Sequence, residues 1–443
     1  MGTIDLLLYP LYVALFYFFF SARRKNYNDP VLQFYHKQGF WIKALSVIPF
    51  TIFNVYISKG DSYGLYYLEG ANIGKMILHN TDNLKLVFSP AADFDQGLLL
   101  DRFNLGYFSA ESNFMVTRIT ALLSIFTFGK YMVTNLVFSM ISFTGVWRLY
   151  RFFYEQYPHL HKQLAIAILY LPTFVFWSSG ILKDPICTGA LGWITYALYE
   201  AFYKKKNLIK NVVIVLFFGY LLAVIKVYIL ISYVPFFILY LILKNATLIK
   251  NKFIRMLIGP TLIVVCMMMF TTIMAQLTDS LGGFAQEGLT KSINTYQKAY
   301  AEQVDATSNF SLGVEYDGSM GTLVKMAPAA IIATLYRPFI WESKKLSTLL
   351  SSFESLAIMF FTIYVFFKVG AKNFIWAIIK DPAILYCILF AVLFALFVGA
   401  TTANFGTLVR YKIPCLPFYI IALFLILDKY KQTKNSPDTI QAA

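Results

Sequence analysis

Long apolar runs alternate with short polar connections along almost the whole chain. About eleven of these runs are long and apolar enough to be interpreted as membrane spans. The sequence therefore predicts an all-α fold, a polytopic bundle of transmembrane helices. The predicted spans are Leu6–Phe20, Trp41–Ile57, Met132–Tyr150, Leu164–Trp177, Ile186–Tyr203, Val212–Ile225, Tyr228–Leu243, Met256–Met274, Leu349–Phe367, Ala383–Thr401 and Ile413–Leu427.

Charged residues divide unequally between the two sides of the predicted membrane. When the connections are assigned alternately to two sides, one side carries 22 Lys and Arg with 6 Asp and Glu, and the other carries 16 with 17. The basic side includes Arg23, Arg24, the lysines at 204–206 and Lys429. Lys and Arg concentrate on the cytoplasmic side of membrane proteins. The N-terminus is therefore predicted outside and the C-terminus inside the cytoplasmic membrane.

Two long segments interrupt the spans, and both are predicted to lie outside. The first long segment covers about residues 58–131 and the second about residues 275–348, and the chain is interpreted as one integral membrane domain, residues 1–443. Apolar stretches too short to span, Met115–Phe128 and Met326–Leu335, predict helices that re-enter the membrane or lie against the bundle. Apolar residues at three- and four-residue intervals in the second segment predict an amphipathic, interfacial helix: Leu289, Ile293, Tyr296, Tyr300 and Val304.

The composition excludes a soluble protein of this length, because only 14% of the residues are charged and 58% are hydrophobic. The net charge of +15 reflects orientation in the membrane, since Lys and Arg lie in short connections and form no basic domain; nucleic-acid binding is not expected. The first apolar run precedes Arg23 and Arg24, the reverse of a secretory signal peptide, and is expected to remain as a span. Four cysteines lie in or beside apolar runs and are expected to act as small hydrophobic residues: Cys187, Cys266, Cys387 and Cys415.

Asp61 is the candidate catalytic residue, at the start of the first long segment and close to the predicted membrane surface. A carboxylate at this position can deprotonate an acceptor hydroxyl or help a divalent cation to bridge phosphates. Whether a metal takes part is left open. The alternative is that Asp61 caps the helix that follows it.

Lys183 and Asp184 lie in a polar break between two apolar runs, predicted outside. Lys183 is a candidate phosphate ligand that Asp184 would hold in position, or the two residues form an ion pair that closes a tight turn. Lys226 interrupts an apolar stretch that extends from Val212 to Leu243, where a charge is costly unless it has a partner or reaches water. It is a further candidate phosphate ligand, with snorkelling to the interface as the alternative.

Arg337 and Glu342 flank an aromatic, proline-containing bend, and Arg410 lies in the last predicted outer connection. The five fixed donors of an Arg suit bidentate phosphate recognition. The structural alternative for Arg337 is an ion pair with Glu342. The alternative for Arg410 is a role as an interfacial anchor.

All seven candidates are assigned to the outer face by the topology alone. Four cations with two or three acids at one interface match a substrate whose polyanionic head lies at headgroup level on a lipid tail. A sugar linked to a lipid through a phosphate or diphosphate is such a substrate. The seven residues are Asp61, Lys183, Asp184, Lys226, Arg337, Glu342 and Arg410.

Four short stretches of sequence resemble polytopic glycosyltransferases of the GT-C class. Asp61 precedes an aromatic-rich helix in an outer segment near the start of the chain, as in that class. The stretch Arg410–Phe418 is similar to the Arg-Tyr and proline pattern that enters the last span of many bacterial envelope glycosyltransferases and polysaccharide polymerases. Trp177–Asp184 and Arg337–Glu342 are similar to segments of other bacterial members of this group.

The resemblance implies transfer of a sugar from a polyprenyl-linked donor to a glycan or lipid acceptor outside the cytoplasmic membrane. Asp61 would act as base or metal ligand, and Lys183, Arg337 and Arg410 would hold the departing phosphate. The chain departs from the usual pattern because its acidic segment follows the second span, no second acid adjoins Asp61, and no soluble C-terminal domain follows. These departures also suit a metal-independent polymerase or ligase acting on lipid diphosphates.

A transporter or flippase of a lipid-linked glycan is the alternative from another functional class. That interpretation needs ionisable residues near the middle of the bilayer and broken helices at matching places in two halves. Lys226 is the candidate that the sequence offers for such a residue.

Overall fold

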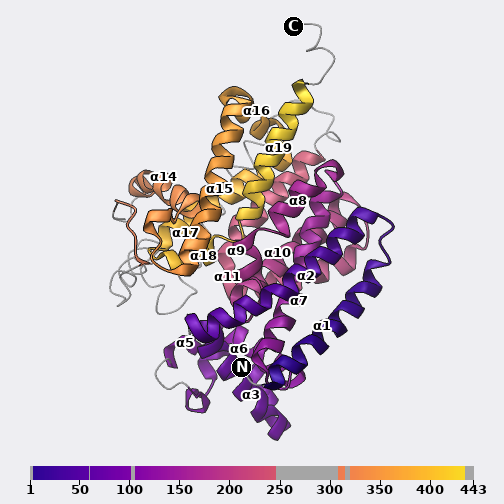
Figure 1. The fold of residues 1–443 in the computed structure, drawn as a ribbon, viewed down its shortest axis with the longest axis vertical. Coiled ribbons are helices and arrows are strands. Elements are labelled where there is room, and N and C mark those ends of the chain that lie inside the picture. Colours follow the sequence, from indigo (N-terminus) through magenta and orange to yellow (C-terminus); the bar gives the residue numbers. More distant parts are fainter. Residues whose placement is uncertain (1–2, 59, 101–104, 246–307, 315–319, 435–443) are drawn as a thin grey trace. The chain divides into compact units, whose positions relative to one another are not determined.

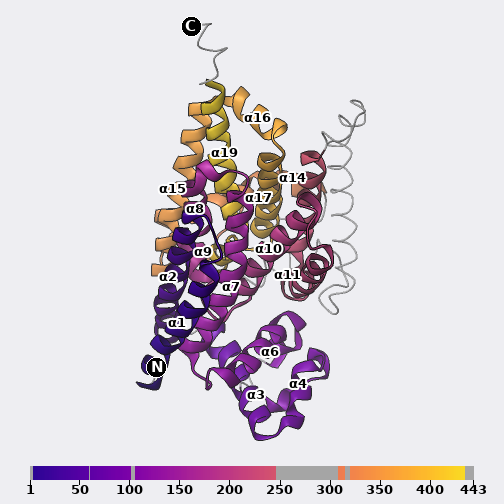
Figure 2. The ribbon, with the colours of Figure 1, turned by 90° about the vertical axis from the view of Figure 1, so that its right-hand side faces the viewer.

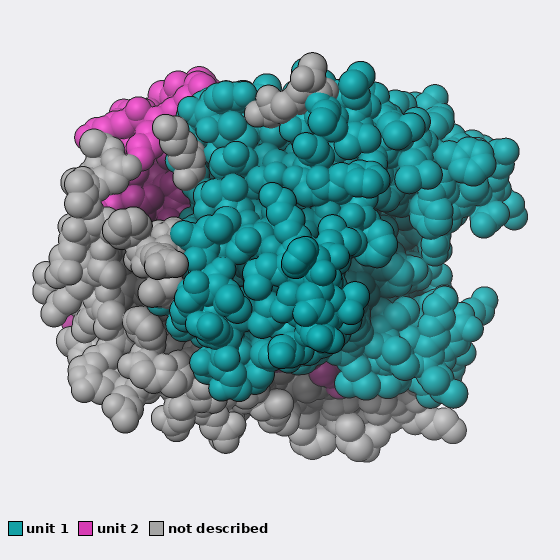
Figure 3. Space-filling view, turned by 90° about the horizontal axis from the view of Figure 1, so that it is seen from below, with its two compact units in different colours: residues 1–227 teal, residues 228–443 magenta. Residues whose placement is uncertain are grey.

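A computed structural model describes residues 3–58, 60–100, 105–245, 308–314 and 320–434, drawn in Figures 1 and 2. As predicted, every regular element in these ranges is a helix. The chain forms two compact units, unit 1 (Met1–Val227) and unit 2 (Tyr228–Ala443), which Figure 3 distinguishes by colour. Each unit is described by itself below.

Six helices within these ranges are long and apolar enough to cross a membrane, and a bent pair would make a seventh. The bent pair consists of α18 (Phe405–Tyr411) and α19 (Leu416–Lys434), whose axes differ by 61°. The chain is therefore a helical membrane protein, as its apolar runs predict. The six single spans are Ile4–Arg24, Pro30–Ile57, Tyr131–Tyr154, Leu208–Lys244, Leu346–Val369 and Pro382–Thr401.

Four predicted spans have a different form in the structure. Ile186–Tyr203 falls in α10 (Lys183–Leu198) and η7 (Tyr199–Tyr203), which are not among these six single spans. Leu164–Trp177 was expected as one span but forms two short helices, α8 (His161–Ile168) and α9 (Pro172–Trp177). Pro172 begins α9, because a proline has no N–H to donate and is tolerated in the first turn of a helix. The two spans expected on either side of Lys226 lie in one element, α11 (Leu208–Lys244), in which Lys226 has non-helical φ and ψ of −151° and 72°.

Two further predictions fall outside the described residues. These are the span Met256–Met274 and the amphipathic helix at residues 289–304.

Unit 1 consists of a helical bundle and the folded first long segment. The bundle helix α2 begins at Pro30 because Asp29 caps it, accepting a hydrogen bond of 2.8 Å from the backbone N–H of Val31. Besides α8, α9 and the first half of α11, the bundle contains α1 (Thr3–Arg24), α2 (Pro30–Ile52) with its extension η1 (Phe53–Ile57), α7 (Tyr131–Tyr154), η6 (Pro158–Leu160) and α10 (Lys183–Leu198) with its extension η7 (Tyr199–Tyr203).

Glycines bring the backbones of α7 and α10 into direct contact. A Cβ atom on Gly145 would lie 1.9 Å from the carbonyl oxygen of Gly189, and one on Gly192 would lie 2.0 Å from that of Gly145. Small residues at a helix interface allow such an approach in membrane proteins. The contact fixes α10 on α7, and with it Lys183 and Asp184 in the first turn of α10.

The first long segment is a compact helical structure. Figure 2 shows α3, α4 and α6 grouped at one end of unit 1. Gly70 and Gly74 of α3 pack on α6, where added Cβ atoms would lie 2.6 Å from Thr120 and 2.1 Å from Ser124. The predicted helix at Met115–Phe128 is part of α6. The elements are η2 (Ser62–Tyr67), α3 (Leu68–His79), η3 (Thr81–Leu84), α4 (Lys85–Phe88), η4 (Ala91–Asp93), η5 (Gln96–Leu98), α5 (Leu105–Ser109) and α6 (Glu111–Phe126).

This segment has its own hydrophobic core and its own polar contacts. The guanidinium of Arg118 pairs with Glu111 and donates to the carbonyl of Ser89, and a carboxylate oxygen of Glu69 accepts from the N–H of Leu100 at 3.0 Å. The segment is thereby held as one body next to the bundle. Its buried core residues are Ile73, Ile77, Val87, Ala91, Phe94, Leu99, Phe108, Phe114 and Ala121.

Unit 2 is a second helical bundle. Gly399 of α17 packs on α14, where an added Cβ would lie 2.2 Å from the carbonyl oxygen of Ala330. The predicted short helix Met326–Leu335 lies within α14, which has 17 residues. Besides α18, α19 and the second half of α11, the unit contains α14 (Met320–Tyr336), η10 (Ile340–Glu342), α15 (Leu346–Val369), α16 (Ala371–Lys380) and α17 (Pro382–Thr401).

Candidate functional site

Asp61 lies at the junction of the bundle and the first long segment. It precedes η2, and its side chain makes no capping hydrogen bond to that helix, so the capping role considered from the sequence is not the arrangement in the structure. The next residue, Ser62, is fully buried and its hydroxyl lies 2.7 Å from the hydroxyl of Tyr131, the first residue of α7. Asp61 is thus held at the start of α7.

Three tyrosine rings form a packed group beside Asp61. The rings of Tyr63 and Tyr67 are stacked with centroids 5.4 Å apart, and both contact Tyr131, at 5.0 and 4.8 Å. Burial raises the pKa of Tyr67 to about 12, so its hydroxyl stays protonated, and it donates a hydrogen bond of 2.7 Å to the carbonyl of Gly129. The group packs η2, which follows Asp61, against the first residue of α7.

Asp184 and Lys226 form a buried ion pair in unit 1. The ammonium of Lys226 lies 2.6 Å from Oδ1 of Asp184, and the two side chains are only 5% and 1% exposed. Lys226 therefore does not snorkel to the interface. Lys183 donates a hydrogen bond of 2.9 Å to the hydroxyl of Ser112, in the first turn of α6. Lys183 thus connects the bundle to the first long segment.

Lys43 is a buried charged residue that the sequence analysis missed. It lies near the middle of the span Pro30–Ile57, is 3% exposed, and donates to the carbonyl and, at 2.8 Å, to the hydroxyl of Ser178. The signal in the sequence was a lysine within the predicted span Trp41–Ile57, where a charge is costly without a partner. Lys43 holds the segment that leads into α10.

Asn135 of α7 holds the same segment from the other side. Its Oδ1 accepts a hydrogen bond of 2.9 Å from the N–H of Ile181, and its Nδ2 donates one of 3.1 Å to Thr51. Asn135 lies about one helical turn after Tyr131, about 6 Å along the axis. The Asp61 contact and the Lys183 segment therefore meet the same end of α7. Within unit 1, the structure brings Asp61, Lys183 and the Asp184–Lys226 pair to this end.

The predicted residues of unit 2 have a separate set of contacts. Nε of Arg337 lies 3.0 and 3.1 Å from the two carboxylate oxygens of Glu342, so the ion pair considered as a structural alternative is present. The guanidinium also lies over the rings of Phe310 and Phe405, at 4.7 and 5.1 Å from their centroids. Arg410 is half-buried in the last turn of α18. Phosphate binding by Arg337 and Arg410 stays a prediction.

Lys412 is a second buried cation that the sequence analysis did not single out. It is fully buried and donates hydrogen bonds of 3.0 Å to the carbonyl of Arg337 and 2.7 Å to the hydroxyl of Ser355. It fixes the backbone at Arg337. A lysine two residues after Arg410 was visible in the sequence, but its burial depends on contacts distant along the chain.

Among the residues described, no group of three or more His, Cys, Asp or Glu side chains is placed to hold a metal ion. Comparison of the chain with protein families, with curated proteins and with solved structures gives no match.

Proposed function

We propose that the protein is an integral-membrane glycosyltransferase that takes a sugar from a polyprenyl-linked donor in envelope glycan or polysaccharide biosynthesis. The observation that carries the proposal is the junction in unit 1, where Asp61 and Lys183 reach the same end of α7 beside the first long segment. An acid and a cation at such a junction supply the two groups that transfer from a lipid phosphate requires.

Each residue at the junction has a chemical role in this proposal. Asp61 accepts the proton of the acceptor hydroxyl. The oxygen of that hydroxyl then forms a bond to the anomeric carbon of the donor sugar. The bond from that carbon to the phosphate oxygen breaks, and both electrons stay on the phosphate, whose charge Lys183 stabilises. The ring faces of Tyr63 and Tyr67 support the sugar. The Asp184–Lys226 pair, buried as it is, positions the first turn of α10.

The proposal includes the orientation of the chain in the cytoplasmic membrane, with the junction outside. In unit 1, α7 begins at the junction and ends near a group of cations, where Lys204 pairs with Glu155 and the guanidinium of Arg151 lies 5.4 Å from the centroid of Tyr27. A basic end opposite the first long segment supports a cytoplasmic assignment for that end. The eleven-span topology predicted from the sequence belongs to the same proposal.

Cysteine labelling tests this orientation. With the four native cysteines replaced, a cysteine at the exposed position Asp82 should react with an impermeant maleimide in intact cells, and one at the exposed position Lys206 should react only after permeabilisation. Reaction at Lys206 in intact cells would reverse the orientation and move the junction to the cytoplasmic side.

Replacing Lys183 tests the function itself. Purified protein in nanodiscs should release polyprenyl phosphate from a polyprenyl-phosphate sugar in the presence of an acceptor, and Lys183→Gln should raise the KM for the donor about tenfold. That figure follows from losing one hydrogen bond to a charged group, worth about 1.5 kcal/mol. Lys75→Gln, an exposed lysine on α3, is the matched control and should leave the KM unchanged.

A polymerase or ligase acting on lipid diphosphates would use the same junction. It differs in releasing polyprenyl diphosphate, so the identity of the released lipid distinguishes the two reactions.

A transporter or flippase of a lipid-linked glycan is the second candidate, and the burial of Lys43 near the middle of α2 favours it. The same nanodisc assay separates the two classes. Movement of intact donor between leaflets without release of polyprenyl phosphate would replace the enzyme proposal with the transporter.

A further inference from the structure

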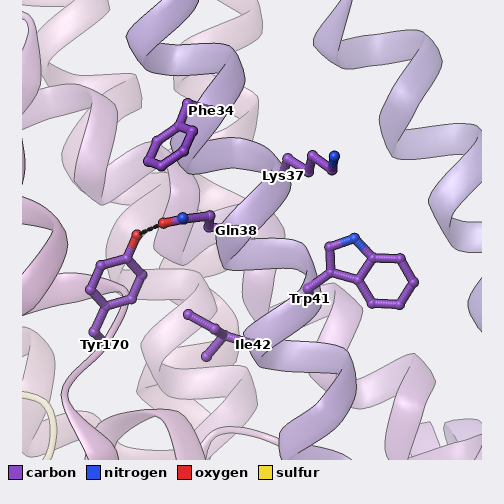
Figure 4. Close-up of a pocket in the computed structure, with 6 residues that line it drawn as sticks. All are labelled: Phe34, Lys37, Gln38, Trp41, Ile42 and Tyr170. Atoms are coloured by element: carbon purple, nitrogen blue, oxygen red, sulfur yellow. Dashed lines mark hydrogen bonds between the residues drawn. The ribbon is translucent and has the colours of Figure 1, made fainter.

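A groove runs along the exposed surface of α2 in unit 1. It has a volume of about 470 Å³ and is lined by residues of α2 and by Tyr170, from the connection between α8 and α9. Figure 4 shows Lys37 and Trp41 on one side of the helix and Tyr170 on the other. The lining residues are Phe34, Lys37, Gln38, Trp41, Ile42 and Tyr170.

The groove combines apolar surface with hydrogen-bond donors. Phe34 is 54% and Trp41 37% exposed, so two large rings remain uncovered along α2. The hydroxyl of Tyr170 donates a hydrogen bond to Oε1 of Gln38. The amide nitrogen of Gln38 then presents its N–H groups as donors. Lys37 is the charged residue among the six.

The groove lies in the first half of α2, next to the cationic end of unit 1. The ring of Trp41 contacts that of Tyr17 at 5.5 Å, and the guanidinium of Arg24 lies 5.6 Å from the centroid of Tyr17. Cations beside apolar and aromatic surface at the end of a spanning helix are the arrangement that attracts anionic lipid headgroups. This end of the groove is therefore complementary to a negative charge at membrane level.

We propose that the groove binds an anionic phospholipid, with its phosphate at Lys37 and its acyl chains along Phe34, Trp41 and Ile42. A membrane lipid is the occupant that fits, because α2 is a membrane span and four of the six lining side chains are aromatic or aliphatic. The ammonium of Lys37 matches the single negative charge of a phosphate diester. The proposal does not depend on the glycosyltransferase assignment.

The experiment measures lipid retained on the purified full chain by native mass spectrometry after exchange into defined lipid mixtures. The native protein should retain phosphatidylglycerol over phosphatidylcholine, and Lys37→Gln should reduce that preference about tenfold, the effect of losing one hydrogen bond to a charged group. Lys210→Gln is the matched control, because Lys210 is also an exposed lysine on a helix of unit 1 and lies outside the groove. Its preference should equal that of the native protein.

A second variant tests the apolar part of the groove. Phe34→Ser should lower retention of both lipids by a similar factor, because the acyl chains are common to both. Equal retention of the two lipids by the native protein, or an equal effect of Lys37→Gln and Lys210→Gln, would overturn the proposal. Self-association that Phe34→Ser abolishes, without any lipid preference, would assign the groove to a second copy of the chain instead.

Discussion

Asp61→Asn is expected to lower turnover of a polyprenyl-linked donor by about a hundredfold or more, the range for loss of a general base. The change keeps the size of the side chain and removes its negative charge. Because Asn keeps one side-chain oxygen that can accept a hydrogen bond, the substitution should leave the first long segment folded. The measurement is the rate of product formation in membranes that contain equal amounts of the two proteins.

The matched control is Asp82→Asn, which removes one carboxylate from an exposed position in the same segment. Its rate should stay within about twofold of the native rate, because surface charges of this kind contribute little. Near-native turnover in Asp61→Asn would remove Asp61 from the mechanism. Charge stabilisation by the cations would then carry the transfer, as in the metal-independent polymerase, or the protein would be a transporter.

The sequence predicted the class of fold because membrane spans leave a strong signal. Runs of about 20 apolar residues are rare outside membranes. Four predicted spans, Leu6–Phe20, Met132–Tyr150, Leu349–Phe367 and Ala383–Thr401, lie within a few residues of the observed ends. The start of α2 was missed by eleven residues, since the run was counted from Trp41 and the helix begins at Pro30. Asp29 followed by Pro30 is a helix-start signal that hydropathy alone does not register.

Breaks within apolar stretches were harder to predict. Hydropathy does not show whether an apolar run forms one helix or two. Leu164–Trp177 was predicted as one span, although Pro172 begins a second helix there, α9, after α8. At Lys226 the charge correctly marked an interruption of the helix, but the backbone there departs from helical geometry without forming a loop. A charged residue in an apolar stretch indicates an unusual environment at that position. It does not show whether the backbone there is helical.

The candidate site was only partly predictable, because the residues that hold it together have no distinctive sequence pattern. Topology placed Asp61, Lys183 and Asp184 on one side of the membrane, and the structure of unit 1 joins them through Tyr131 and Asn135, two polar residues of α7. Neither of these has a distinctive sequence pattern, since a single buried Tyr or Asn is common in spans. The partners of charged residues are also distant along the chain.

The ion pair between Asp184 and Lys226 shows this distance, because the two partners are 42 positions apart in the sequence. Asp184→Asn is expected to destabilise the protein by about 3–5 kcal/mol, because it leaves the Lys226 ammonium buried without a carboxylate. The measurement is the amount of folded protein recovered in detergent together with its thermal midpoint. Lys429→Gln, which breaks the ion pair with Asp381 in which the lysine side chain is 41% exposed, is the control and should cost about 1 kcal/mol or less.

The double variant Asp184→Leu with Lys226→Met separates a structural role of this pair from a role in binding. Replacing a buried ion pair by apolar residues of similar volume is often neutral or stabilising, so the double variant should recover the folded protein that Asp184→Asn loses. If the pair only positions the first turn of α10, the recovered protein should bind the donor with a KM within about threefold of the native value. A folded double variant whose donor KM rises tenfold or more would instead make Lys226 a direct phosphate ligand, as the sequence first suggested, and the ion pair with Asp184 would then be the arrangement that the donor displaces.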